Sequence, residues 1–151
     1  MRFDEFRARH GEVEPELDAL TERIIGACIE VHKELGAGLT ELLYQEALCH
    51  EFDLRGIRYE KQAKVPVVYK GKPIGETRID LLVEDSIILE LKALGSIVSK
   101  HEAQTIHYLK ATGCERGLLV NFGAPRLEYK RFVFTHALTP HLRTNSANSC
   151  S

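Results

Sequence analysis

The sequence predicts an α/β fold of the α+β type, in which a mixed central β-sheet is flanked by helices. Two amphipathic helical patterns come first, over residues 18–35 and from residue 39 to Gly56. Three β-rich stretches follow between residues 58 and 92, and one helical segment and two more strands then lead to residue 135. This order, helix-helix-βββ-α-ββ, indicates a helix-and-sheet sandwich with a mixed sheet.

Both N-terminal helices are predicted from the spacing of their apolar residues. In the first, charged residues lie between apolar residues at helical intervals, and Gly36 ends the pattern. The second helix begins at once and stops near Gly56. Its expected core stripe consists of Leu39, Leu43, Ala47 and Leu54.

Turn signals divide the central β-rich region into two hairpins. The stretch Lys70-Gly71-Lys72-Pro73 predicts the first turn, and the polar residues 84–86 predict the second. The flanking residues 74–83 and 87–91 are rich in Ile, Leu and Val, as strands are. We therefore expect three consecutive antiparallel strands.

The remaining elements are one helix and two strands. Ser99 and Glu102 have the spacing of a capping box, so we expect a helix from there to about Thr112. Residues 117–122 form a short apolar run that is typical of a buried strand. In residues 126–135, polar and apolar residues alternate well enough to predict a final strand.

Size and composition indicate one soluble globular domain, since 44% of the 151 residues are hydrophobic and 28% are charged. We expect residues 18–135 to form this domain, residues 1–17 an N-terminal extension and residues 136–151 a mobile tail. The charged start has no apolar signal region and no run reaches membrane-spanning length. A cytoplasmic protein without membrane association is the expectation.

The net charge of -2 offers no general attraction to nucleic acid, so contact with DNA or RNA requires a local basic patch. The first hairpin is a candidate because it carries Lys61, Lys64, Lys70 and Lys72. Lysines on an edge strand also discourage aggregation. The sequence leaves both interpretations open.

The second hairpin predicts a cluster of charges. Counting outward from a three-residue loop at residues 84–86 puts Asp80 directly opposite Glu90. Like charges at this separation destabilise a sheet, so either one carboxyl is protonated or a cation lies between them. Lys92 lies two residues beyond Glu90 and therefore faces the same side. The surrounding residues are apolar, and charges in such surroundings must be paired or bound to metal.

Several of these residues resemble a known family. Gly38, Glu41 and Tyr44 match the motif of the GxxExxY proteins, a family assigned to the PD-(D/E)XK nuclease superfamily. Asp80 followed by Glu90-Leu91-Lys92 is similar to the D…ExK signature of that superfamily.

Two further features bear on the resemblance. Gln104 and Tyr108 resemble the QxxxY motif of its exonuclease-like branches, and the likeness extends over about residues 18–135. Ile79 stands where the superfamily's name has proline, a residue that many members lack.

The resemblance implies a restriction-endonuclease-like core and a metal-dependent nuclease that hydrolyses DNA or RNA with a metal-activated water. It implies that Asp80 and Glu90 bind Mg²⁺ or Mn²⁺, together with the backbone carbonyl of Leu91. Glu41 would assist, directly or through water. Oxygen ligands of this kind suit Mg²⁺, which takes few carboxylates from protein and keeps several waters.

By the same resemblance, Lys92 would orient the attacking water or stabilise the transition state. Gln104 and Tyr108 lie four residues apart on one helical face, so both could contact the same phosphate or hold Lys92 in position.

Other interpretations stay open at this point. The charges around Asp80 could form a structural ion cluster, and the domain could be an inactive module that binds nucleic acid or a partner. A homodimer or partner protein could supply specificity. A covalent enzyme that uses Lys92 as its nucleophile is disfavoured, because two neighbouring carboxylates would raise the pKa of the amine.

Overall fold

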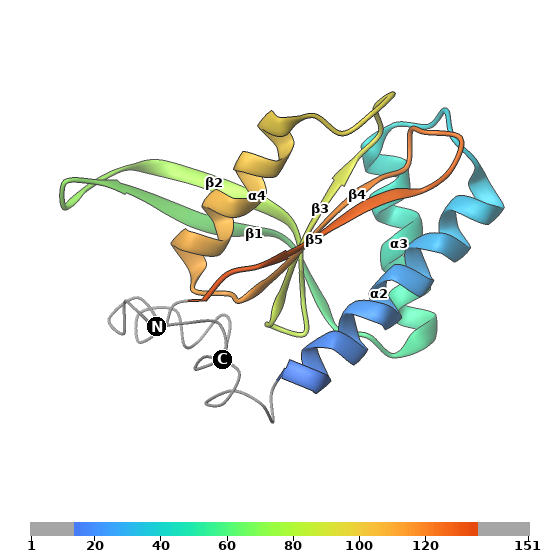
Figure 1. Ribbon diagram of the computed structural model, residues 1–151, viewed down its shortest axis with the longest axis horizontal. Helices are drawn as coiled ribbons and strands as arrows, with labels where there is room; N and C mark the ends of the chain where they lie inside the picture. The colour runs from blue at the N-terminus through green and yellow to red at the C-terminus, as the bar shows by residue number, and fades with distance from the viewer. Residues whose placement is uncertain (1–13, 136–151) are drawn as a thin grey trace.

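The computed structural model describes residues 14–135, and its elements follow the predicted order (Figure 1). The helices are α2 (Glu14–Leu35), α3 (Glu41–Arg55) and α4 (Ser99–Thr112). The strands are β1 (Tyr59–Tyr69), β2 (Lys72–Val83), β3 (Ile87–Lys92), β4 (Arg116–Asn121) and β5 (Glu128–Val133). The predicted tail lies outside the described residues, as does most of the predicted N-terminal extension.

The five strands form one mixed sheet in the order β1-β2-β3-β4-β5. All neighbours are antiparallel except β3 and β4, which run parallel. A parallel pair needs a crossover connection, and α4 provides it. The mixed sheet expected from the sequence is confirmed.

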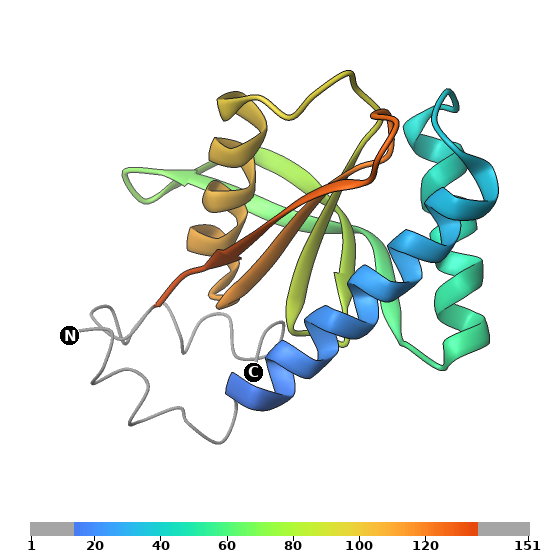
Figure 2. The ribbon, with the colours of Figure 1, turned by 45° about the vertical axis from the view of Figure 1, so that its right-hand side comes forward.

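Helices cover both faces of the sheet. Helices α2 and α3 lie on one face and α4 lies on the other (Figure 1, Figure 2). Two separate apolar cores result: Ile87 and Leu89 of β3 point into the core under α2 and α3, and Ile88 points into the core under α4. Strands β3 and β4 are therefore buried on both faces, as central strands between two helical layers must be.

Helix α3 turns a different face to the core than the sequence suggested. The expected stripe is wrong, because Leu43 and Leu54 are 52% and 69% exposed. The buried side chains are Tyr44, Gln45, Leu48, Cys49 and Phe52. The tyrosine accounts for the rotation, because its ring stacks on Phe122 of the sheet layer with 4.7 Å between the ring centroids.

Two helix starts also differ from expectation. Helix α2 begins at Glu14 rather than near residue 18, and Pro15 suits its first turn because the missing N–H has no helical acceptor there. The capping box at Ser99 is not formed. The N–H of Val98 donates to Nδ1 of His101 at 3.3 Å instead, while Glu102 pairs with Lys130.

No helix within residues 14–135 has both the length and the apolar character needed to cross a membrane.

Candidate functional site

The β2–β3 hairpin has the register that the sequence predicted. Val83 lies opposite Ile87, and Leu81 lies opposite Leu89. One step further out, the backbone N–H of Asp80 donates to Oε1 of Glu90 at 2.9 Å. In return, the backbone N–H of Leu91 donates to Oδ2 of Asp80 at 2.8 Å. Each strand thus holds the carboxylate of the other.

The pleat of β2 is interrupted at Asp80. Ile79 and Leu82 both pack in the core under α4, although strict alternation would put them on opposite faces. The neighbouring strand is irregular at the same level: Gln62 has a φ of 53°, and Gln62 and Asp80 are absent from the register that joins Lys61 to Leu81 and Ala63 to Ile79. This break is where the Asp80 N–H meets a side chain rather than a backbone carbonyl.

Burial and repulsion act together on Glu90, which is only 3% exposed. Desolvation, together with the negative charge of Asp80, raises the pKa of its carboxyl to about 8. The hydrogen bond from Asp80 and the charge of Lys92 oppose the shift, whereas the charge of Glu41 reinforces it. Without a bound cation, Glu90 therefore holds a proton through much of the neutral range.

Helix α4 closes the site from one side. The Nζ of Lys92 donates to Oε1 of Gln104 at 3.4 Å. One turn later, the hydroxyl of Tyr108 shares a hydrogen bond of 3.1 Å with Oγ1 of Thr77 on β2. Desolvation raises the pKa of the Tyr108 hydroxyl, and the carboxylates of the site contribute further. The two residues of the QxxxY pattern thus approach the same cluster from one helical face.

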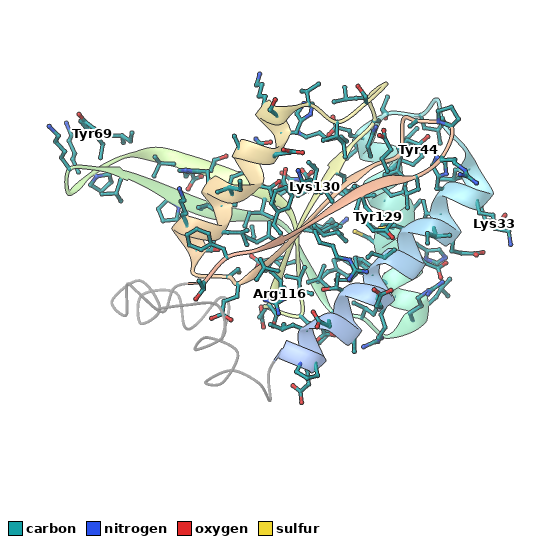
Figure 3. The ribbon with its side chains drawn as sticks, viewed as in Figure 1. Lys33, Tyr44, Tyr69, Arg116, Tyr129 and Lys130 are labelled. Carbon is teal, nitrogen blue, oxygen red and sulfur yellow. The ribbon has the colours of Figure 1, made fainter. Side chains whose placement is uncertain are left out.

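The Gly38, Glu41 and Tyr44 motif forms a braced helix start. Gly38 has a φ of 109°, which favours glycine. The hydroxyl of Tyr44 donates to the carbonyl of Gly36 at 2.5 Å and accepts the N–H of Leu39 at 3.2 Å. This bracing fixes the loop that leads into the first turn of α3, where Glu41 lies within electrostatic reach of Glu90. Figure 3 shows Tyr44 where the α2–α3 loop meets the sheet layer.

The donor atoms suit a hard divalent cation, although they do not form a complete cage. Within residues 14–135, no three His, Cys, Asp or Glu side chains gather as a group that could hold a metal. Asp80 and Glu90 provide two carboxylates, and no other described residue donates a hydrogen bond to Oδ1 of Asp80 or Oε2 of Glu90. Mg²⁺ and Mn²⁺ accept such a partial set, because backbone oxygens and water complete their coordination.

Asn121 is a site residue that sequence reasoning missed. It is fully buried and lies beside Lys92 in the parallel register of β3 and β4. Its side chain accepts the N–H groups of Leu94 and Gly123 at 2.9 and 3.0 Å and donates to the carbonyl of Leu94 at 3.0 Å. The hydrogen bonds of Asn121 therefore hold the backbone in place just after Lys92. The available signal was an amide side chain that ends an apolar strand two residues before a glycine.

Comparisons with known proteins bear on the family of this chain. A family model described as the PD-(D/E)XK nuclease superfamily matches residues 18–132. None of the curated proteins matches the sequence. Among solved structures, the chain is similar to one titled "Crystal structure of SSO0001", with 17% sequence identity, a TM-score of 0.43, and coverage of 85% of this chain and 86% of that chain. Because the family match spans far more than half of the sequence, this chain belongs to the PD-(D/E)XK nuclease superfamily.

Proposed function

We propose that this chain is a metal-dependent nuclease of the GxxExxY branch that hydrolyses backbone phosphodiesters of DNA or RNA. Membership of the superfamily supports a nuclease-type function and a nucleic-acid substrate. The observation that carries the proposal is the reciprocal hold of Asp80 and Glu90 across the hairpin, with Lys92 next on the same side of β3. Such a hold presents two carboxylates in a fixed relation before any substrate arrives.

Asp80 and Glu90 are the proposed ligands of Mg²⁺ or Mn²⁺, with the backbone carbonyl of Leu91 and with Glu41 acting directly or through water. The free oxygens of the two carboxylates support this assignment. When bound, the ion supplies a water of lowered pKa and neutralises charge on the phosphate. Glu90 would release its proton as it becomes a ligand, since only the carboxylate form binds the cation well.

Lys92 is the proposed group that stabilises charge developing on the phosphate or orients the attacking water. Its ammonium group can act there as a hydrogen-bond donor and a positive charge. Gln104 restrains its Nζ through the hydrogen bond from β3 to α4. Tyr108, held by Thr77, lies one helical turn further on and could donate to a non-bridging phosphate oxygen.

Cleavage assays with isosteric variants test the proposal. Asp80→Asn and Glu90→Gln keep an oxygen that can accept the N–H groups of the hairpin, and Lys92→Met keeps most of the aliphatic stem. Each should abolish Mg²⁺- or Mn²⁺-dependent cleavage while the protein stays folded. Glu34→Gln and Lys33→Met, at exposed positions of α2, are the matched controls and should cleave normally.

Calorimetric titration with Mn²⁺ gives a second measurement that does not depend on turnover. Wild-type protein should bind the ion, and Asp80→Asn and Glu90→Gln should bind it at least tenfold more weakly. Wild-type protein that cleaves neither duplex, single-stranded nor branched DNA, nor RNA, would refute the nuclease. Binding of nucleic acid by such an inert protein would support an inactive binding module instead.

A further inference from the structure

The outer part of the β1–β2 hairpin is a ribbon that no other described element covers. We call residues 66–75 the outer ribbon. All of them are exposed except Val67, which is half-buried. The hairpin reaches past α4 in both views (Figure 1, Figure 2), and Tyr69 marks its tip in Figure 3. Three large apolar side chains near the tip, Val68, Tyr69 and Ile74, are 57%, 61% and 61% exposed.

The ribbon and its approach are positively charged. The segment from Lys61 to Gly75 contains four lysines and no acidic residue, although the whole chain has a net charge of -2. Lys61 is neutralised by Glu46 at 3.0 Å. No described acidic residue forms an ion pair with the remaining three, and Nζ of Lys70 lies 5.5 Å from the centre of the Tyr69 ring. The ribbon therefore presents uncompensated charge to an anionic partner.

The shape of the ribbon narrows the choice of partner. Lys70 and Gly71 form a tight two-residue turn with φ values of 47° and 81°. Val67 pairs with Gly75 and Val68 with Pro73, so Ile74 is an extra residue that forms a bulge. A bulge bends a ribbon and increases its twist. The major groove of B-form DNA is wide enough for a two-stranded ribbon, whereas that of A-form RNA is too deep and narrow to be read by side chains.

We infer that the outer ribbon enters the major groove of duplex DNA, on the same molecule whose phosphodiester lies at Asp80 and Glu90. This inference rests on the proposed function. Lys72 and Asp80 belong to the same strand, and eight extended residues span roughly 26 Å. At about 3.4 Å per base pair, this distance corresponds to about 8 base pairs. The enzyme therefore requires a duplex arm of that length on one side of the cleaved bond.

An edge that merely resists aggregation would carry its lysines along the open side of β1. Lys61 and Lys64 have such a position on β1, whereas Lys70 and Lys72 lie at the turn and at the start of β2. Their placement at the far end of the ribbon favours contact with a ligand.

Binding assays without divalent metal test the ribbon separately from cleavage. Fluorescence anisotropy would measure the affinity of wild-type protein, Lys70→Gln, Lys72→Gln and the double variant for a duplex of about 24 base pairs. Each lost phosphate contact should reduce the slope of log affinity against log salt by about 0.9 and weaken binding about 8-fold at 0.1 M salt. The double variant should therefore bind about 60-fold more weakly. Lys33→Gln removes the same charge at the opposite end of the molecule (Figure 3) and should change binding less than 2-fold.

Two further comparisons make the test decisive. Shortening the duplex to about 6 base pairs should abolish the difference in affinity between wild-type protein and the double variant, because the duplex then no longer extends to the ribbon. Duplex RNA of the full length should bind more weakly than DNA and be insensitive to the ribbon substitutions.

An unchanged salt slope in the double variant, equal affinity for duplex RNA, or no binding of duplex DNA would overturn the inference. Ribbon substitutions that change only self-association would identify the ribbon as a contact between two copies of the chain, which also overturns it. Ribbon-dependent binding by a protein that never cleaves would support the contact between the ribbon and duplex DNA, but it would refute the proposed nuclease and with it the required duplex arm.

Discussion

Replacing Glu90 by glutamine should make the folded protein more tolerant of alkaline pH. The substitution keeps the shape of the side chain and an oxygen that can accept the Asp80 N–H. It removes a carboxyl that the fold strongly prefers to keep neutral, since burial and the charge of Asp80 raise its pKa to about 8.

The magnitude follows from the two pKa values. In the unfolded chain the carboxyl has its ordinary pKa of 4.5, so the folded state binds the proton more tightly. The stability that this proton provides is fully present below pH 4.5 and is lost as the pH rises through 8. Linkage at 1.36 kcal/mol per pKa unit gives a loss of about 4 kcal/mol between pH 5 and pH 9 in the wild-type protein, which the glutamine variant should not show.

Urea unfolding in the presence of a chelator, followed by circular dichroism at intervals of pH, measures this difference. The free energy of unfolding of Glu90→Gln relative to wild type should rise steadily up to about pH 8 and then level off. Glu34→Gln, which removes an exposed carboxylate, controls for the change in net charge. Saturating Mn²⁺ should stabilise wild-type protein increasingly as the pH rises, because the ion competes with the proton, and should have little effect on the variant.

Parallel stability curves for wild type and Glu90→Gln between pH 5 and pH 9 would refute the reasoning. Such curves would mean that the Glu90 carboxyl titrates alike in the folded and unfolded chains and is neither desolvated nor repelled by Asp80.

Three other substitutions test separate parts of the structure by thermal or urea unfolding. Tyr44→Phe removes the hydroxyl that binds the α2–α3 loop. It should lower the free energy of unfolding by about 1–3 kcal/mol and reduce cleavage. Normal stability together with normal activity would contradict the bracing role. Gly123→Ala should destabilise by more than about 2 kcal/mol, because an added Cβ would lie 2.3 Å from backbone atoms of Leu94, whereas Gly95→Ala has open space and should be nearly neutral. Leu48→Ala should lower the free energy of unfolding by about 2–5 kcal/mol, and Leu54→Ala by less than about 0.5 kcal/mol. The reverse order would mean that α3 packs with the face predicted from the sequence.

The hairpin at the site could be predicted because its rules are local. A polar three-residue loop fixes the register as far as Leu81 and Leu89, and one further step brings Asp80 within hydrogen-bond distance of Glu90. The break in the pleat at Asp80 could not be predicted in the same way. It coincides with an irregular Gln62 on the neighbouring strand, and no periodicity within β2 reports it.

The sequence predictions are wrong where contacts with distant residues determine the local structure. Helix α3 contains two apolar stripes, of which the predicted one includes Leu43 and Leu54. The other faces the core because Tyr44 stacks on Phe122, which comes from a remote strand end. The predicted capping box is not formed for a similar reason, since Glu102 pairs with Lys130 of β5. Asn121 was missed because its partner Leu94 lies across a parallel pair whose crossover the sequence does not specify.

The interlocked hydrogen bonds of Asp80 and Glu90 have an evolutionary consequence. Since each carboxylate receives a backbone N–H of the opposite strand, both acids help to fasten the sheet as well as to serve chemistry. A lineage that had abandoned hydrolysis would still be selected to retain an acceptor oxygen at both positions, as the acid or as its amide. Among residues 14–135, the side chain of Lys92 forms a hydrogen bond with Gln104 alone, so the fold leaves this position free to change. Among related sequences, an invariant lysine at this position is therefore the better sign that natural selection still maintains the reaction.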